Sequence, residues 1–428
     1  MNNPLTSLLA APERDALLAD IDAIVGAVPE PSDVMRMRGI LPAELLSAAN
    51  VLLGIVLGTR KARRLGKAHT GWWYTVAGAE QATHPKIASH HATRFAGCRH
   101  VVEVCTGVGM DATALAGCAT RVTTFEADAV TAALATGNLR ASGIDNVEVR
   151  NEAVDAQTVL AAFDGLWADP SRRGADGRRT TSTREYSPLL ETLVAIGEQQ
   201  PNAIVGIKCG PGDLMPHMVR DSFASEFIGY HGECRERILW KNARVPPLAV
   251  YLADAAKRWS PHDTSLVSPR DTSIAPSPDA HLPGSILLGD IVFEPHAALV
   301  ASGAVGKFFS EHTLRPIHEK IAYAIGSRET TNLDALLDWA DAFEIVRVDV
   351  GVSEKRIQEN LRELNWSSRT EFKKRGWSGE PEELRRKLSF ASSDHFGVVI
   401  IARTDHGHLT MYCRRLPRAS IEVGRESP

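Results

Sequence analysis

The feature that most constrains the fold is a regular alternation of short apolar segments and helical segments, which begins near residue 100. Stretches rich in Ala and Leu separate the apolar segments. Strands that alternate with helices at this spacing indicate a parallel, doubly wound sheet with helices on both faces. We therefore predict an α/β fold with strands at Val101–Val104, Val122–Phe125, Val147–Val149, Gly165–Ala168 and Ala203–Ile207.

The sequence on either side of this region predicts further domains, because a chain of 428 residues exceeds the usual size of one domain. The N-terminal part carries apolar residues at three- and four-residue spacings, which is typical of helices. Residues 260–283 are dense in Ser, Pro, Asp and His, as in a linker, and a strand is expected at Ile286–Phe293. The expected domains are a helical domain at 1–97, the doubly wound domain at 98–258, a linker and connecting strand and helix region at 259–342, and a small α/β domain at 343–418.

Composition excludes several classes of protein. A formal net charge of −4 gives the chain no overall attraction for nucleic acid, so a nucleic-acid surface has to be local. The cysteines are scattered, and the adjacent His90 and His91 point in different directions on a helix, so we expect no metal and place these histidines at the surface or at a helix cap. The N-terminus does not read as a signal peptide, and the apolar run Ala49–Gly58 is too short to span a bilayer. A cytoplasmic protein without a membrane partner is expected.

A glycine turn follows the first predicted strand. The segment Val101–Ala112 is typical of a strand, a turn and a helix, and its turn contains Gly107 and Gly109. Glycines let the backbone approach a ligand closely at the carboxyl end of the sheet, where α/β folds bind ligands. The Gly-x-Gly-x-x-Ala spacing also fits a dinucleotide fingerprint, so two cofactor classes stay open. The candidate cofactor-binding residues here are Cys105, Thr106, Gly107, Gly109, Asp111 and Ala112.

Acidic residues near other strand ends narrow this choice. Glu103 stands four residues before the first glycine, where a dinucleotide fingerprint normally has an apolar residue. Glu126 ends the second strand, and a carboxylate there can accept both hydroxyls of a ribose in either cofactor class. The fourth strand ends at Asp169, which Pro170 places in a rigid turn.

These segments together resemble class I S-adenosylmethionine-dependent methyltransferases, and among them a bacterial group with a C-terminal THUMP-like domain. The resemblance covers most of the chain from about residue 70, and it implies a Rossmann-like fold with S-adenosylmethionine as cofactor. The segments that carry it are Glu103–Gly109, Glu126, Asp169–Arg173, Tyr74–Thr83, Lys208–Gly212 and Phe293–Pro295.

The resemblance implies which part of the cofactor each matching residue would contact. Glu103 and the glycine turn would place the methionine end. Glu126, followed by Ala127, would hold the ribose. Glu152, followed by Ala153, would recognise the adenine amino group.

The turn after the fourth strand would hold the methyl acceptor. Asp169 would hold a target amine so that its lone pair faces the methyl group. Ser171 and Arg172 replace the second proline and the aromatic residue of the Asn/Asp-Pro-Pro-aromatic form of base amino-methyltransferases, so stacking of a flipped base by that residue is not supported. The Asp-Pro-x-Arg form is closer to enzymes that methylate uridine carbon through a cysteine; Cys209 is the candidate, and a buried, inert thiol is the alternative. The predicted catalytic residues are Asp169, Pro170, Ser171 and Arg172.

RNA is the substrate that the resemblance implies, because THUMP domains are associated with RNA modification. The basic run Arg60–Lys67 precedes Trp72, Trp73 and Tyr74, and basic side chains near aromatic ones suit phosphate neutralisation with base stacking. A solvated helix face and a buried Trp pair would give the same letters. The candidate substrate-binding residues are Arg63, Arg64, Arg173, Lys208, Lys373 and Lys374.

The sequence therefore predicts an enzyme that methylates RNA by direct transfer to a base amino group. A small-molecule or protein methyltransferase is one alternative. A module that binds cofactor or RNA without turnover is another. The sequence leaves the oligomeric state open.

Overall fold

A computed structural model of the chain describes residues 3–173, 180–244, 248–252, 256–261, 286–328 and 332–417. The chain divides into two compact units. One consists of Met1–Glu226 and Glu236–Pro246, and the other of Phe227–Arg235 and Pro247–Pro428. Most of the predicted linker at 260–283 lies outside the described residues.

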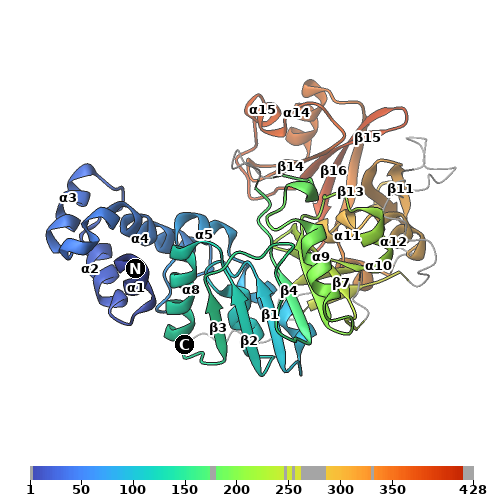
Figure 1. The fold of residues 1–428 in the computed structure, drawn as a ribbon. Coiled ribbons are helices and arrows are strands. Elements are labelled where there is room, and N and C mark those ends of the chain that lie inside the picture. Colours follow the sequence, from blue (N-terminus) through green and yellow to red (C-terminus); the bar gives the residue numbers. More distant parts are fainter. Residues whose placement is uncertain are drawn as a thin grey trace, which may run out of the picture. The chain divides into compact units, whose positions relative to one another are not determined.

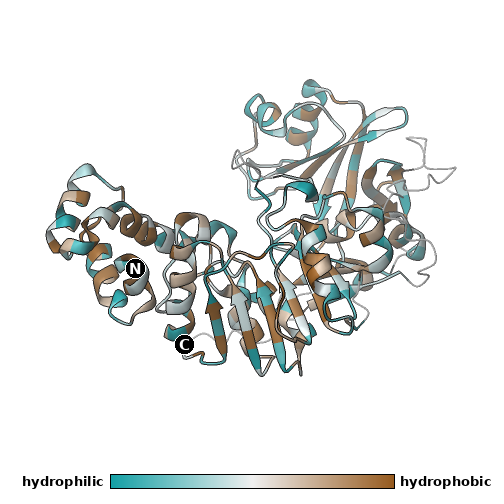
Figure 2. Ribbon diagram, viewed as in Figure 1, coloured by the Kyte–Doolittle hydropathy of each residue, from teal (hydrophilic) through white to brown (hydrophobic). Residues whose placement is uncertain are grey.

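The N-terminal part of the first unit is helical, as predicted (Figure 1). Its longest helix, α4 (Ala49–Arg64), buries Leu52 and Ile55 against Leu18 and Ile21 of α2, and hydrophobic residues gather along it in Figure 2. The other helices are α1 (Pro4–Ala10), α2 (Arg14–Ile24), α3 (Pro31–Ile40), η1 (Ala43–Ala48), α5 (Val76–Gln81), α6 (Pro85–Ala92) and η2 (Thr93–Phe95).

One apolar helical run is longer than the sequence patterns indicated. Continuous helix over η1 and α4, Ala43–Arg64, is long and apolar enough to cross a membrane by length and composition alone, whereas the expected run was Ala49–Gly58. Core helices of globular domains pass the same test. Leu52, Ile55 and Val56 of this run are fully buried in the helical cluster, and 39% of its most apolar window is buried.

The central sheet has the strand order β3-β2-β1-β4-β5-β7-β6-β8-β9. Strands β1 to β5 are parallel and carry the five predicted segments, whereas β7 runs antiparallel to β5. Their bounds are β1 (His100–Val104), β2 (Arg121–Phe125), β3 (Val147–Arg150), β4 (Gly165–Ala168), β5 (Ile204–Cys209), β6 (Ala224–Tyr230), β7 (Glu233–Lys241), β8 (Ala249–Leu252) and β9 (Ala256–Trp259). The helices between them are α7 (Met110–Ala116), α8 (Ala129–Ala141), η3 (Thr183–Glu185), α9 (Leu190–Glu198) and α10 (His217–Ser222).

This strand order fixes where a ligand can bind. Strand β1 lies between β2 and β4. The strands β2 and β3 therefore lie on one side of β1, and β4 and β5 lie on the other. A crevice forms outside the carboxyl ends of the strands at such a switch point. The glycine turn, Glu126 and Asp169 all follow strands that end at this edge.

The second sheet has the order β11-β12-β10-β13-β16-β15-β14 and belongs to the second unit. The predicted boundary at residue 343 falls inside β13, and β10 to β12, which lie in the expected connecting strand and helix region, share a sheet with β13. Its elements are β10 (Ile291–Pro295), α11 (Ala297–Ala301), α12 (Val305–Glu311), β11 (Arg315–His318), β12 (Ile321–Gly326), α13 (Leu333–Leu337), β13 (Ala340–Val350), α14 (Glu354–Glu363), β14 (Glu371–Arg375), α15 (Pro381–Arg386), β15 (Val398–Thr404) and β16 (Gly407–Arg415).

The strand expected at Ile286–Phe293 was placed too early. Asp290 accepts a hydrogen bond from the Leu287 amide (2.9 Å), and the Asp290 amide donates back to the Leu287 carbonyl (3.1 Å). These bonds close a turn, so β10 begins only at Ile291 and continues to Pro295.

Candidate active site

The glycine turn after β1 has a backbone that few residues other than glycine adopt. The φ angles are 68° at Cys105, 56° at Gly107 and 97° at Gly109, all in the left-handed region. A Cβ at Gly107 would have no heavy atom within 4 Å, so this residue borders open space. A Cβ at Gly109 would instead meet Ala135 and Leu139 of α8 at 3.6–3.8 Å. The turn therefore presents its backbone outward and packs its second glycine on α8.

Three hydrogen bonds of Asn138 fix this turn against the N-terminal part of the chain. Asn138 of α8 donates hydrogen bonds to the carbonyls of Val108 and Trp73 (both 3.1 Å) and accepts one from the Trp73 amide (3.0 Å). Helix α5 follows directly, and a Cβ at Gly78 would lie 2.8 Å from Cγ1 of Val108. The helix therefore lies on the glycine turn with no room for a side chain between them.

A cavity of about 370 Å³ opens beside the turn at the carboxyl edge of the sheet. All the predicted cofactor-binding residues line it except Glu103, Gly109 and Ala112. The predicted residues that line it are Cys105, Thr106, Gly107, Asp111, Glu126, Ala127, Glu152, Ala153 and Asp169.

Part of the cavity wall was not predicted as a site. Helix α5 and the residues around it form one side, and the loop at Ser187 and Pro188 contributes another. The segment Tyr74–Thr83 carried the family resemblance, and that was its only signal in the sequence. The unpredicted lining residues include Thr75, Ala77, Gly78, Gln81, Ala82, Thr83, Asp128, Thr131, Ser187 and Pro188.

Glu126 projects from the end of β2 into the cavity. Its carboxylate accepts hydrogen bonds from the amides of Gly107 (2.9 Å) and Asp128 (3.0 Å). Burial raises the pKa of Glu126, although these amide bonds oppose the shift. Each carboxylate oxygen can accept a second hydrogen bond, so the side chain keeps acceptor capacity for two ligand hydroxyls.

Glu103 lies in β1 but does not line the cavity. Its side chain is buried and accepts a hydrogen bond from the Thr124 hydroxyl. Burial, together with the nearby charge of Asp111, raises the pKa of Glu103 to about 8. Glu103 therefore lies behind the cavity lining and carries a proton near neutral pH, and its expected contact with the methionine end of the cofactor stays a prediction.

Asp169 lies where two cavities meet. It lines the first cavity and also a second one of about 210 Å³. The cavities share Gln81 and Ser171 as well. The other residues of the second cavity are Glu80, Pro170, Arg172, Arg173 and Lys208, so all four predicted catalytic residues line it.

Lys208, at the end of β5, lines the second cavity and holds Asp169. Its Nζ lies 2.7 Å from Asp169 Oδ2, 3.4 Å from Glu236 Oε2 and 3.0 Å from the Thr83 hydroxyl. Burial raises the pKa of Asp169, and Lys208 opposes that shift. Lys208 therefore has internal partners for its charge, and its predicted contact with a substrate stays a prediction.

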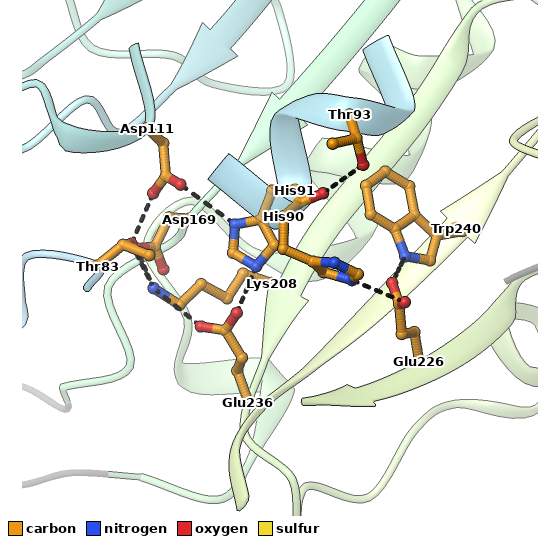
Figure 3. A network of polar contacts seen from close by, with 10 residues as sticks. All are labelled: Thr83, His90, His91, Thr93, Asp111, Asp169, Lys208, Glu226, Glu236 and Trp240. Atoms are coloured by element: carbon orange, nitrogen blue, oxygen red, sulfur yellow. Dashed lines mark hydrogen bonds and ion pairs between the residues drawn. The ribbon is translucent and has the colours of Figure 1, made fainter. Parts of the chain in front are cut away.

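His91 belongs to the same polar network, shown in Figure 3. Its Nδ1 lies 3.2 Å from Asp111 Oδ1, and its Nε2 contacts Glu236 Oε1. Burial disfavours the charged imidazole, but Glu236 and Asp111 outweigh burial and raise the pKa of His91 to about 9. The expectation of a surface or capping histidine was wrong.

His90 is buried as well but belongs to a separate group of contacts. Its Nε2 lies 3.0 Å from Glu226 Oε1 (Figure 3). Trp240 Nε1 donates to the same carboxylate at 2.8 Å, and Arg94 pairs with it at 3.2 Å. Within the described ranges, no group of three or more His, Cys, Asp or Glu residues is arranged to hold a metal ion.

Cys209 does not fit the role of a nucleophile. Its side chain is fully buried and lines neither cavity. Burial raises the pKa of its thiol to about 12, so the thiolate is scarce at neutral pH. The alternative of a buried, inert thiol describes this residue.

The aromatic and basic residues proposed to bind RNA are mostly engaged within the protein. Trp72, Trp73 and Tyr74 are buried, so they offer no stacking surface. Arg63 pairs with Asp22 at 3.3 Å.

The basic residues of the second unit also have acidic partners. Lys373 pairs with Glu294 and Lys374 with Glu380, both at 2.7 Å. Arg173 lies 3.7 Å from Glu80, whereas Arg64 is an exposed residue at the end of α4. The buried Trp pair is the reading that holds.

The comparisons with known proteins agree with this fold. Residues 340–415 match the THUMP domain-like family. Two Mycobacterium tuberculosis proteins, from strains CDC 1551 / Oshkosh and H37Rv, are described as uncharacterized S-adenosylmethionine-dependent methyltransferases and are each 28% identical over 351 residues, which cover 80% of this chain and 89% of theirs. The crystal structure of a protein from Porphyromonas gingivalis W83 described as a methyltransferase has a TM-score of 0.69 at 16% identity, covering 95% of this chain and 98% of that one. The last similarity concerns the fold.

Proposed function

We propose that this chain, a class I S-adenosylmethionine-dependent methyltransferase with a C-terminal THUMP-like domain, methylates RNA by direct transfer to a base amino group in the cytoplasm. The observation that carries the proposal is the pair of cavities that meet at Asp169. The residues that line the first cavity suit a nucleoside, and the second cavity would hold a methyl acceptor beside it.

The first cavity fits S-adenosylmethionine. When bound, the cofactor supplies a methyl group on a positively charged sulfur. Gly107 would let the backbone approach it, and Glu126 would accept hydrogen bonds from its ribose hydroxyls. Glu152 and Ala153 line the part of the cavity that follows β3 and would contact the adenine. Asp111 lines the cavity as well, and its carboxylate suits a cationic ligand.

Asp169 would hold the acceptor amine. Its carboxylate can accept a hydrogen bond from an amino group in the second cavity and turn the nitrogen lone pair toward the first. An amine held in this way would present its lone pair to the methyl group that the cofactor supplies, with the electron pair of the broken carbon–sulfur bond remaining on sulfur. The Asp169 carboxylate would take the proton that the methylated nitrogen releases. Cys209 takes no part in this reaction, because it lines neither cavity.

RNA as substrate is supported by two features. Residues 340–415 match a THUMP domain-like family, and the family resemblance associates such domains with RNA modification. Arg172 and Arg173 line the acceptor cavity, where cationic side chains favour a phosphate-bearing substrate. The buried Nη1 of Arg172 has no hydrogen-bond partner among the described residues.

A methyltransferase that acts on a small molecule or a protein is the second candidate. It is favoured by the ion pairs that engage Arg63, Lys373 and Lys374, and by the formal net charge of −4. No aromatic residue lines the acceptor cavity within the described part of the chain, so a flipped base would lack a stacking partner there.

A labelling experiment tests the proposal. The full-length protein is incubated with methyl-labelled S-adenosylmethionine and, separately, with total RNA, protein and low-molecular-weight extracts of cells that lack it. We expect label in RNA, and about a hundredfold slower labelling by Asp169→Asn, because the acceptor loses its alignment. Asp155→Asn, which changes an exposed loop acid that lines neither cavity, is the control. Label confined to another fraction supports the second candidate, and equal rates for Asp169→Asn and wild type contradict the role of Asp169.

A further inference from the structure

Five side chains beside the two cavities form a closed ring of polar contacts (Figure 3). Asp111 contacts His91 through Oδ1 (3.2 Å) and accepts from the Thr83 hydroxyl through Oδ2 (2.6 Å). Lys208 Nζ lies 3.0 Å from that hydroxyl and 3.4 Å from Glu236. Glu236 contacts His91 and closes the ring. We call these residues the polar ring; its members are Thr83, His91, Asp111, Lys208 and Glu236.

The polar ring joins elements that are far apart in the sequence. His91 lies on α6, Asp111 on α7, Lys208 on β5 and Glu236 on β7. Asp111 and Thr83 line the cofactor cavity, whereas Lys208 lines the acceptor cavity and contacts Asp169 at 2.7 Å. The ring thus has two members in the wall of the cofactor cavity and one in the wall of the acceptor cavity, and Asp169, which is not a member, contacts Lys208.

Two members of the polar ring line neither cavity. The side chains of His91 and Glu236 are 1% and 3% exposed, so no ligand in these cavities can touch them. A buried imidazole between two carboxylates, and a buried carboxylate between an imidazole and an ammonium, are costly unless their charges are paired. Their presence behind the cavities therefore calls for a role through their neighbours.

We propose that His91 and Glu236 are positioning residues: His91 fixes the Asp111 carboxylate in the wall of the cofactor cavity, and Glu236 holds Lys208 against Asp169 at the acceptor cavity. The inference rests on the proposed function. Asp111 has two oxygens, one held by His91 and the other by Thr83, so its orientation is set from both sides. Loss of either contact frees the Asp111 carboxylate to rotate.

The charges around His91 support this assignment. The groups that face it are Asp111 from α7, Glu236 from β7, and the Trp167 ring from β4 at 4.4 Å between ring centres. The His90 ring lies 6.5 Å away on the same helix. Two carboxylates and one aromatic face favour an imidazolium that donates from both nitrogens. Such a group can bridge Asp111 and Glu236 only in its charged form.

A pair of neighbouring histidines provides a matched test. His90→Gln and His91→Gln change the same residue type on the same helix, and both histidines are buried, but only His91 belongs to the polar ring. Glu226→Gln and Glu236→Gln form the corresponding pair of acids. The affinity of each folded full-length variant for S-adenosylhomocysteine is measured by calorimetry at neutral pH.

We expect His91→Gln and Glu236→Gln to bind S-adenosylhomocysteine about tenfold more weakly than their controls His90→Gln and Glu226→Gln, because a charged hydrogen bond that orients the site is lost. Affinities equal to those of the controls overturn the inference. A wild-type protein that does not bind S-adenosylhomocysteine overturns the proposed function first, and the ring then has no ligand to position.

A second measurement does not depend on the folding of variants. In wild-type protein labelled with nitrogen-15, the His91 imidazole should show two protonated nitrogens at neutral pH, and its signals should move when S-adenosylhomocysteine binds. The His90 signals serve as the internal control. A singly protonated His91 whose signals do not respond to the ligand contradicts the proposal, even if the variants cannot be purified.

Discussion

Three acidic residues lie near the carboxyl ends of neighbouring strands of this site, and their surroundings give each a different chemistry. Glu103 is buried next to Asp111, so its pKa rises to about 8. Glu126 accepts two backbone amides and borders the cavity. Asp169 contacts Lys208 at 2.7 Å and lies where both cavities meet. An acid at a strand end is therefore not by itself a ligand-binding acid.

Glu103 offers a direct test of this distinction. Because the side chain is neutral near pH 7 and lies behind the cavity lining, Glu103→Gln keeps both its size and its charge state. We expect the affinity for S-adenosylhomocysteine to change by less than about threefold, since no charged hydrogen bond to the ligand is lost. Calorimetry at pH 7 measures this. A loss comparable to that of a Glu126 variant would show that Glu103 contacts the cofactor after all.

The paired state of His91 predicts a pH dependence of stability. The pKa of His91 is raised from 6.5 to about 9 in the folded protein, because Glu236 and Asp111 outweigh the effect of burial. The folded state therefore holds this proton more tightly than the unfolded state. The resulting stabilisation is complete below pH 6.5 and is lost as the pH rises toward 9.

Urea unfolding of wild type and His91→Gln at two pH values checks this expectation. The difference in free energy of unfolding between the two proteins should be largest at about pH 6 and should shrink by about pH 9.5. A difference that stays constant, or that grows with pH, would mean that His91 is not held in its charged form.

At the scale of elements, the site depends on how closely α5, α8 and the glycine turn pack. Gly58 of α4 permits part of this close packing, since a Cβ there would lie 2.2 Å from the Tyr74 carbonyl oxygen. The Tyr74 amide also donates to the Thr59 hydroxyl at 3.0 Å. These contacts hold the segment that leads into α5, which then covers the turn after β1.

The glycine turn allows a test with a matched control on the same helix. Gly109→Ala should lower the free energy of unfolding by about 1–2 kcal/mol, because φ is 97° there and a Cβ disfavours left-handed backbone. Gly117 ends α7 with φ −74°, and a Cβ there would meet its nearest atom at 3.5 Å. Chemical denaturation should therefore show a smaller effect for Gly117→Ala; equal losses would refute the strain argument.

The sequence predicted those elements whose pattern is local. The strand and helix periods located β1 to β5, and the turn chemistry located the glycine turn and Asp169. Strands β6 to β9 were missed. They follow the part of the chain in which strands and helices alternate regularly, and no described helix separates them from one another. The cavity wall formed by α5 comes from a segment that precedes β1 and shows its role only through packing.

Roles that depend on distant partners could not be predicted. Arg60 meets Asp22 at 2.6 Å and Lys373 meets Glu294 at 2.7 Å, and these partners are 38 and 79 positions away. When these acidic partners are not known, the basic residues are expected to bind phosphate. His91 was misplaced for the same reason, since Glu236 lies 145 positions away.

At the scale of the whole molecule, the residues that line the two cavities all belong to the first unit. Both cavities and the polar ring are formed by residues of Met1–Glu226 and Glu236–Pro246. The THUMP-like match at 340–415 lies in the second unit, within a sheet that begins at β11. The predicted boundaries between domains remain proposals. Cofactor binding can therefore be tested without knowledge of the acceptor.

The measurement that tests the central claim most directly is calorimetric titration of the full-length protein with S-adenosylhomocysteine, beside Glu126→Gln. Glu126 borders the cavity and is the residue proposed to hold the ribose hydroxyls. We predict micromolar binding by wild type and an affinity about tenfold to a hundredfold lower for the variant, because hydrogen bonds to a charged acceptor are lost. The absence of binding by folded wild-type protein would contradict the claim that this site holds S-adenosylmethionine.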